Sequence, residues 1–122
     1  MARPIHFEVF ASDPEAMAGF YERAFGWTVN KADIGAGPPY WLITTGDENE
    51  IGINGGMGQG PAPPFPGTTT TLGVEDLDAA IAGVEAAGGS VLMGRMEIPG
   101  VGSLAYVADP EGHAFGLMQP TE

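Results

Sequence analysis

Residues 5–15 read IHFEVFASDPE and join a predicted strand directly to a helix start. The first seven of these residues are rich in β-branched and aromatic side chains, which is typical of a strand. The next four supply a capping residue, a proline and an early acid, which together favour the first turn of a helix. We expect this helix to end at Gly26, because glycine adopts the left-handed cap conformation without strain.

The same order of elements returns in the second half of the chain. A shift of 63 residues pairs Asp13 with Asp76 and Gly26 with Gly89, so both predicted helices begin and end at matching positions. Residues 54–67 are rich in proline and glycine, which argues against a helix or a central strand there and favours a linker or a cover loop. We expect strands at 27–29, 40–44 and 51–53, then at 68–74, 90–93, 104–107 and 114–118, with the second helix at 76–87.

Composition excludes several classes of protein. The chain has 122 residues, with 16 Asp and Glu against 4 Lys and Arg, and a formal net charge of −12. This balance leaves no electrostatic basis for binding nucleic acid or an anionic membrane. The absence of cysteine excludes a disulfide scaffold, a thiolate zinc site and a cysteine nucleophile. No apolar run approaches the length of a membrane span, so we expect a cytoplasmic protein.

Several short motifs occur in an order that is typical of one protein family. They are His6 followed by Asp13, the pair Phe20-Tyr21, the triplet Phe25-Gly26-Trp27, the segment VEAAGG at 84–89, and the turn DPEG at 109–112. In these motifs the chain resembles the vicinal oxygen chelate superfamily, which includes glyoxalase I, bleomycin-resistance proteins and extradiol dioxygenases. The resemblance extends over nearly the whole chain.

The resemblance implies an α+β fold in a single domain, residues 1–122. Two tandem βαβββ modules, at about 4–54 and 68–120 with a linker at 55–67, would form curved mixed sheets around a ligand cavity, with the helices on the outer face. The family implies a homodimer, and sheet edges left open by isolated modules favour one as well. Whether the modules pair within one chain or swap across a dimer stays open.

The resemblance also implies four positions for metal ligands, one on the first and one on the last strand of each module. In this chain those positions hold His6, Ile53, Thr69 and Gly116. A catalytic metal needs about three protein ligands, and neither Ile53 nor Gly116 can coordinate one. We therefore expect no metal and no other cofactor, and a divalent metal is disfavoured. A site rebuilt from His6 and His113 is also disfavoured, because strand alternation separates His113 from the face of Gly116.

Alternation along the first strand divides its side chains between two faces. His6, Glu8 and Phe10 share the face predicted to line the cavity, whereas residues 7, 9 and 11 should pack under the helix with Phe20 and Phe25. His6 and Glu8 are the candidate catalytic residues, and Phe10 is a candidate ligand contact. Two alternatives stay open: His6 as a hydrogen-bonded wall residue, and Glu8 as a solvated residue at an exposed strand end.

Further ligand contacts are predicted in the second module and on the third strand. The same alternation sends Thr69 and Thr71 to the cavity. Aromatic and sulfur-containing side chains on other strands could also line the cavity, although spacing does not determine their facing; they are Tyr40, Trp41, Tyr106 and Met118.

Two functions from different classes fit these residues. The first is a glyoxalase/bleomycin-resistance-like protein that binds a small neutral or cationic aromatic molecule, since the negative charge disfavours an anion. The alternative is a lyase, isomerase or epimerase that uses His6, and Glu8 with it, for proton transfer or that has an atypical metal site. A structural or regulatory subunit is a third, less informative possibility.

Overall fold

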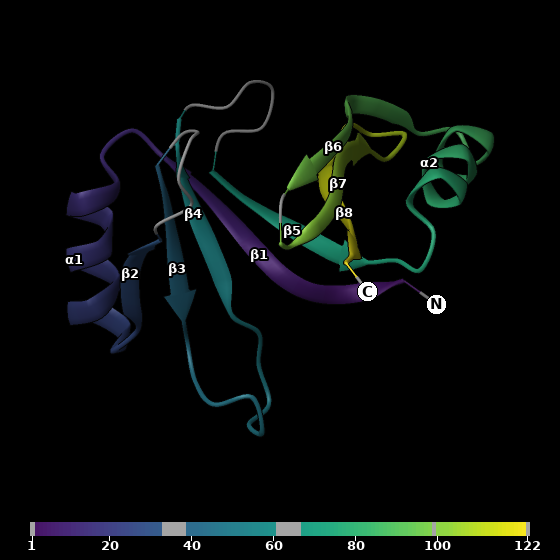
Figure 1. Cartoon of the computed structure of the whole chain (residues 1–122). Coiled ribbons are helices and arrows are strands. Elements are labelled where there is room, and N and C mark those ends of the chain that lie inside the picture. Colours follow the sequence, from purple (N-terminus) through teal and green to yellow (C-terminus); the bar gives the residue numbers. More distant parts are fainter. Residues whose placement is uncertain (1, 33–38, 61–66, 99, 122) are drawn as a thin grey trace. The chain divides into compact units, whose positions relative to one another are not determined.

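The structure is a computed structural model that describes residues 2–32, 39–60, 67–98 and 100–121. Within these ranges the elements follow the order strand, helix and three strands, twice over (Figure 1). Their bounds are β1 (Arg3–Ala11), α1 (Pro14–Phe25), β2 (Thr28–Ala32), β3 (Tyr40–Thr44), β4 (Gly55–Gln59), β5 (Gly67–Gly73), α2 (Leu77–Ala86), β6 (Ser90–Ile98), β7 (Gly102–Ala108) and β8 (Ala114–Pro120). The predicted α+β class is confirmed.

The chain divides into two compact units. The N-terminal unit comprises residues 6–68, and the C-terminal unit comprises residues 69–122 together with residues 1–5. The strand β1 therefore starts among residues of the C-terminal unit and continues as a strand of the N-terminal unit. Each unit has its own hydrophobic cluster, which is what a separately packed unit requires.

In the N-terminal unit the strands follow the order β2-β3-β4-β1. The pairs β2–β3 and β3–β4 are antiparallel, whereas β1 and β4 run parallel. The helix α1 covers one face of this sheet, where Ala18 and Tyr21 pack against a core that includes Val9, Ile43 and Met57 (Figure 1). Among the described residues of this unit no helix covers the opposite face, and that helix-free face presents the predicted site residues of β1.

Helix α1 begins and ends as predicted from its sequence. Asp13 caps it, because its Oδ1 accepts the backbone N–H of Ala16 at 3.2 Å, and Pro14 occupies the first turn. Gly26 ends it in the left-handed conformation, with φ of 72°, and donates its N–H to the Glu22 carbonyl at 3.0 Å.

The face that α1 turns to the sheet differs from the prediction. Phe20 and Phe25 were expected to pack beneath the helix, but they are 47% and 58% exposed. Ala18 and Tyr21 take that place, and Phe20 and Phe25 instead form an outer aromatic cluster, with their ring centroids 6.0 Å apart. A small alanine at the contact lets the helix approach the sheet closely, so the bulky phenylalanines turn outward.

The fourth strand of this unit lies later in the sequence than predicted. We expected a strand at 51–53, but Ile51 is exposed and the strand β4 spans Gly55–Gln59, inside the stretch taken as a linker. β4 is also central, because it pairs with β1 on one side and β3 on the other. Aromatic side chains of the neighbouring strands fill the space beside its glycines, which is a setting in which a glycine-rich strand is tolerated. The prolines at 61–66 lie outside the described residues.

In the C-terminal unit the strands follow the order β5-β8-β7-β6. β5 and β8 run parallel, and the pairs β8–β7 and β7–β6 are antiparallel. The helix α2 packs on one face, where Leu77, Ala105, Val107 and Leu117 form the core. Asp76 caps α2 by accepting the N–H of Ala79 at 3.1 Å.

No helix in the described ranges has the length and apolar character needed to cross a membrane.

Candidate functional site

The helix-free face of the N-terminal unit carries a compact group of polar side chains from β1 and β3. Glu8 Oε1 lies 2.8 Å from His6 Nε2, and the Tyr40 hydroxyl donates to the same oxygen at 2.6 Å. Tyr40 also lies 3.4 Å from His6 Nε2, too long for a strong hydrogen bond. We call His6, Glu8 and Tyr40 the polar triad.

The triad has a defined direction of hydrogen bonding. An ionised carboxylate can only accept, so the hydrogen of the His6–Glu8 contact is on Nε2 of the imidazole. The Tyr40 hydroxyl gives its proton to the bond with Glu8, and this charge-assisted bond is short, as such bonds are. The Glu8 side chain is only 12% exposed and that of His6 is 30% exposed. Glu8 is therefore a mostly buried acid, and the alternative of a solvated strand end is wrong.

A glycine in β4 makes the triad possible. β4 lies between β1 and β3, so the Tyr40 side chain must cross it to reach Glu8. Gly56 is the register partner of Glu8, and a Cβ built on Gly56 would overlap the Tyr40 hydroxyl. Any other residue at this position would displace Tyr40. Sequence reasoning named Tyr40 only as a possible lining residue and missed Gly56 altogether.

The triad is bordered by apolar side chains. Phe10 follows Glu8 by two residues on the same face, and its ring lies 3.6 Å from where a Cβ on its register partner Gly58 would stand. Leu42, the β3 partner of Gly56, is 51% exposed. Gly56 thus lets the Tyr40 hydroxyl lie across β4, while the Phe10 ring lies beside Gly58.

Trp41 belongs to a different environment. It is buried in the core of the N-terminal unit, on the face that α1 covers. The Lys31 ammonium lies 5.5 Å from the centroid of its ring. Trp41 therefore lies on the opposite side of the sheet from His6, Glu8 and Phe10, as strand alternation with Tyr40 requires.

The four remaining predicted contacts share the helix-free face of the C-terminal unit. Thr71 on β5 pairs in register with Gly116 on β8, which pairs with Tyr106 on β7. Thr69 lies two residues from Thr71, and Met118 lies two residues from Gly116, so both are on this same face. Thr69, Thr71 and Tyr106 are buried, whereas Met118 is half-buried.

Thr71 has an unusual local environment. It is 1% exposed, and its Oγ1 is the buried side-chain polar atom without a hydrogen-bond partner among the described residues. A Cβ on Gly116 would lie 3.0 Å from this oxygen. Leaving a buried hydroxyl without a partner costs stability, so this position is destabilising in the isolated chain.

His113 is held at a turn on the surface. Its Nδ1 lies 2.8 Å from Asp109 Oδ2, and its backbone N–H donates to Asp109 Oδ1 at 2.9 Å. These contacts lower the pKa of Asp109 below its ordinary value, mainly through the hydrogen bond from the His113 backbone and further through the His113 side chain. We call this arrangement of His113 and Asp109 the turn lock, because it fixes the chain between β7 and β8.

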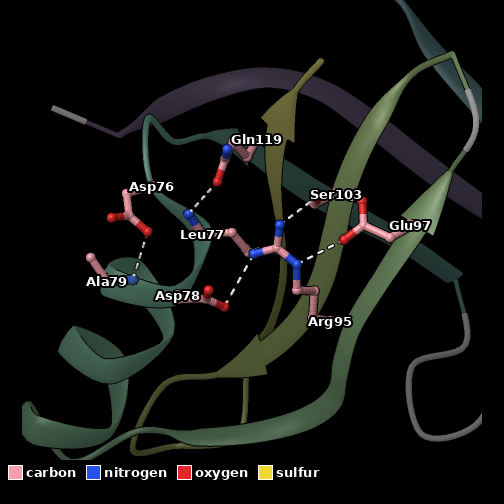
Figure 2. Close-up of polar contacts among 8 residues, drawn as sticks. All are labelled: Asp76, Leu77, Asp78, Ala79, Arg95, Glu97, Ser103 and Gln119. Carbon is pink, nitrogen blue, oxygen red and sulfur yellow. Dashed lines mark hydrogen bonds and ion pairs between the residues drawn. The ribbon is translucent and has the colours of Figure 1, made fainter. Parts of the chain in front are cut away.

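An arginine network lies on the C-terminal unit, and sequence reasoning did not find it. Figure 2 shows the Arg95 guanidinium between Asp78 of α2 and the β6–β7 pair, with contacts to Asp78 Oδ1 at 3.1 Å, Glu97 Oε1 at 2.8 Å and Ser103 Oγ at 3.1 Å. The Ser103 hydroxyl donates to Glu97, and this bond, followed by the one from Arg95, lowers the pKa of Glu97. Asp78 and Glu97 therefore neutralise the charge of Arg95, and the contact between Arg95 and Asp78 links α2 to the sheet.

A pocket of about 550 Å³ lies beside the start of α2. Its lining residues are Gly73, Val74, Glu75, Gln119 and Pro120. Gln119 Oε1 accepts the N–H of Leu77 at 2.8 Å, as drawn in Figure 2, so this side chain serves the helix start. None of the predicted site residues lines this pocket.

The described residues do not form the grouping that a metal centre requires. In the described part of the chain, no three His, Cys, Asp or Glu side chains are grouped so as to hold an ion. The strand registers also correct one candidate position: Thr71 pairs with Gly116, and Glu8 pairs with Gly56, so Gly56 rather than Ile53 matches Gly116. Gly56, like Gly116, has no side chain that could coordinate.

Comparison with known proteins identifies the family. A family model for the Glyoxalase/Bleomycin resistance protein/Dioxygenase superfamily matches residues 3–117. The chain therefore belongs to this superfamily, as its sequence motifs indicated.

Related sequences come from Mycobacterium and Streptomyces. The chain is 33% identical to CFP32 of Mycobacterium bovis, which carries the name putative glyoxylase, over 93% of this chain and 42% of that protein. It is also 33% identical to the anthracycline biosynthesis protein DnrV of Streptomyces peucetius, over 93% of this chain and 46% of that protein. The chain thus spans less than half the length of these relatives.

Solved structures support the fold. Methylmalonyl-CoA epimerase from Mycobacterium tuberculosis matches with a TM-score of 0.69 at 14% identity, over 98% of this chain and 88% of that one. A variant of the Streptomyces coelicolor methylmalonyl-CoA epimerase, in complex with 2-nitronate-propionyl-CoA, matches with a TM-score of 0.70 at 18% identity, over 98% of each chain. At such low identity the likeness extends to the fold alone.

Proposed function

We propose that this protein binds a small neutral or cationic aromatic molecule on the helix-free face of its N-terminal unit. The observation that carries the proposal is the mostly buried Glu8 carboxylate, which His6 and Tyr40 orient beside Phe10 and the exposed Leu42. A few oriented polar groups next to apolar surface are what small-molecule sites generally contain.

Two further observations support an aromatic ligand. Flat rings stack well on exposed or half-exposed aromatic side chains, and Phe10 provides one beside the triad. The relative DnrV is named for anthracycline biosynthesis, and anthracyclines are fused-ring compounds. The net charge of −12 favours neutral and cationic ligands over anionic ones.

Our proposal includes the finer organisation of the fold. We propose that each strand–helix–three-strand set acts as a βαβββ module and that its helix-free face lines a ligand cavity. Thr69, Thr71, Tyr106 and Met118 stay predicted ligand contacts of the C-terminal unit. We propose that the protein is a homodimer without a metal or other cofactor; light scattering and elemental analysis of the purified protein would test these two points.

The ligand proposal is tested by isothermal titration with two planar probes, 1-aminonaphthalene and the 4-aminoquinolinium cation. Phe10→Ala should weaken binding of either probe by about tenfold, because a stacking surface is lost. Phe20→Ala is the matched control: it removes an exposed phenylalanine of α1 and should leave affinity unchanged. Absence of binding to the unmodified protein, or equal losses in the two variants, would contradict the proposal.

A second candidate function is proton transfer, as in a lyase, isomerase or epimerase. The 2.8 Å contact between His6 and Glu8 favours it, because a carboxylate that orients an imidazole is a common acid–base arrangement. The test is incubation of a carbon acid such as methylmalonyl-CoA in deuterated water, with mass spectrometry of the recovered compound. Deuterium uptake that disappears in His6→Ala would establish the enzyme; no uptake would favour the binding protein.

A further inference from the structure

The two oxygens of the Glu8 carboxylate are used very differently. Both hydrogen bonds of the triad end on Oε1, which accepts from Tyr40 and from His6. No described residue donates to Oε2, and this oxygen is not among the buried polar atoms that lack a partner. Oε2 therefore keeps lone pairs that no described residue uses, and it is not fully buried.

No lysine or arginine of the described residues pairs with this carboxylate. Among the ion pairs of the described residues, Glu8 has only His6 as a partner, while Arg95 is occupied by Asp78 and Glu97. When its imidazole is neutral, His6 donates from Nε2 and leaves the full negative charge on Glu8. Because the side chain is only 12% exposed, water screens that charge less than it would at an open surface.

Apolar side chains border Glu8 on the helix-free face. Gly56 leaves room for the Tyr40 hydroxyl to lie across β4, and the Phe10 ring lies beside Gly58. Leu42, in register with Gly56, stays half-exposed at the border. A planar ligand could rest on this surface while its edge faces Glu8.

We propose that Glu8 determines ligand charge: the site takes a planar cation whose ring or exocyclic N–H group donates to Glu8 Oε2. This inference rests on the proposed binding function and narrows it from neutral or cationic ligands to cationic ones. The ionised carboxylate makes a hydrogen bond from any ligand N–H charge-assisted, and a cationic donor adds a Coulomb attraction that a neutral donor lacks. The difference corresponds to about a tenfold preference for a cation over a neutral ligand of the same shape.

The test uses two isosteric probes, the 4-aminoquinolinium cation and neutral 1-aminonaphthalene, titrated calorimetrically into the full chain. The unmodified protein should bind the cation about tenfold more tightly. Glu8→Gln, which keeps the shape of the side chain, should bring the ratio close to one. Glu22→Gln is the matched control, because it removes the same formal charge from the exposed surface of α1 and should leave the ratio at about tenfold.

Each outcome decides one question. Equal affinities of the unmodified protein for the two probes would overturn the charge inference while leaving the binding function intact. Binding of neither probe would overturn both. A ratio that falls equally in Glu8→Gln and Glu22→Gln would assign the preference to overall charge rather than to Glu8, and would also overturn the inference. If Glu8→Gln does not fold, Tyr40→Phe serves in its place. This change removes one hydrogen-bond donor from Glu8 Oε1 and should keep the preference for the cation at about tenfold or more. Loss of the preference in Tyr40→Phe would overturn the inference.

Discussion

Gly56→Ala should dismantle the polar triad without altering any of its members. Gly56 has no left-handed backbone angle, so alanine is compatible with its conformation. The added Cβ would overlap the Tyr40 hydroxyl, and the ring would have to swing away from β4. Tyr40 would then lose its 2.6 Å hydrogen bond to Glu8.

The expected cost follows from three contributions. Loss of a hydrogen bond to a charged group costs about 1.5–3 kcal/mol. Forcing an extra methyl group into a packed position costs about 1–3 kcal/mol. Replacing glycine by alanine restricts the unfolded chain, which by itself raises the free energy of unfolding by about 0.5–1 kcal/mol. The free energy of unfolding should therefore fall by about 1.5–5.5 kcal/mol.

Urea denaturation followed by tryptophan fluorescence measures this change. Gly58→Ala is the matched control, because its Cβ would lie 3.6 Å from the Phe10 ring, an ordinary contact, and the variant should be neutral or slightly stabilised. In a Tyr40→Ala background Gly56→Ala should no longer be destabilising, since the obstructing group is gone. Equal effects at Gly56 and Gly58, or additive effects of the Gly56 and Tyr40 changes, would refute this reasoning.

Three further changes test other parts of the structure. Thr71→Val removes a buried hydroxyl that has no partner among the described residues, so it should raise the free energy of unfolding by about 1 kcal/mol; a loss of stability in urea titrations would indicate a partner for that oxygen. Asp109 has a pKa below its ordinary value of 3.8, so its contribution to stability is complete above that pH and is lost as the pH falls through the lower folded value. Asp109→Asn should therefore lower the melting temperature at neutral pH and make the melting temperature fall less steeply in acid. Thermal melts from neutral pH down to about pH 2 would show this. Parallel plots of melting temperature against pH for the two proteins would count against the turn lock. Ser103→Ala should raise the pKa of Glu97 toward its ordinary value, because the hydrogen bond from the Ser103 hydroxyl is the largest cause of its lowering. NMR titration of the Glu97 carboxyl carbon measures this pKa. An unchanged pKa would mean that Arg95 alone suffices to lower it.

Local signals in the sequence were sufficient for the helices and for the faces of β1. Asp13, Gly26 and Asp76 act through hydrogen bonds to residues no more than four positions away, so their effects can be predicted without the fold. Strand alternation is equally local, and it placed His6 and Glu8 on one face of the sheet. The family resemblance, now confirmed, rests on the order of such motifs along the chain.

The position of β4 could not be derived from local signals. Ile51 and Ile53 have a higher strand propensity than glycine, yet the strand forms at Gly55–Gln59. Side chains from β1 and β3 lie beside Gly55 and Gly56, and only the absence of a side chain at these two glycines allows that packing. The shift of 63 residues without a gap, which matched the two helices, did not predict the position of β4.

The sequence by itself determined the α+β class, the helix boundaries, the family and the pairing of His6 with Glu8 on one strand face, because each depends on neighbours in the chain or on motif order. Only the tertiary structure brought Tyr40 to Glu8 across 32 residues, moved Trp41 into the core and turned Phe20 outward. These outcomes depend on strand register and on how closely α1 approaches the sheet. Such contacts between distant segments leave no periodic pattern in the sequence.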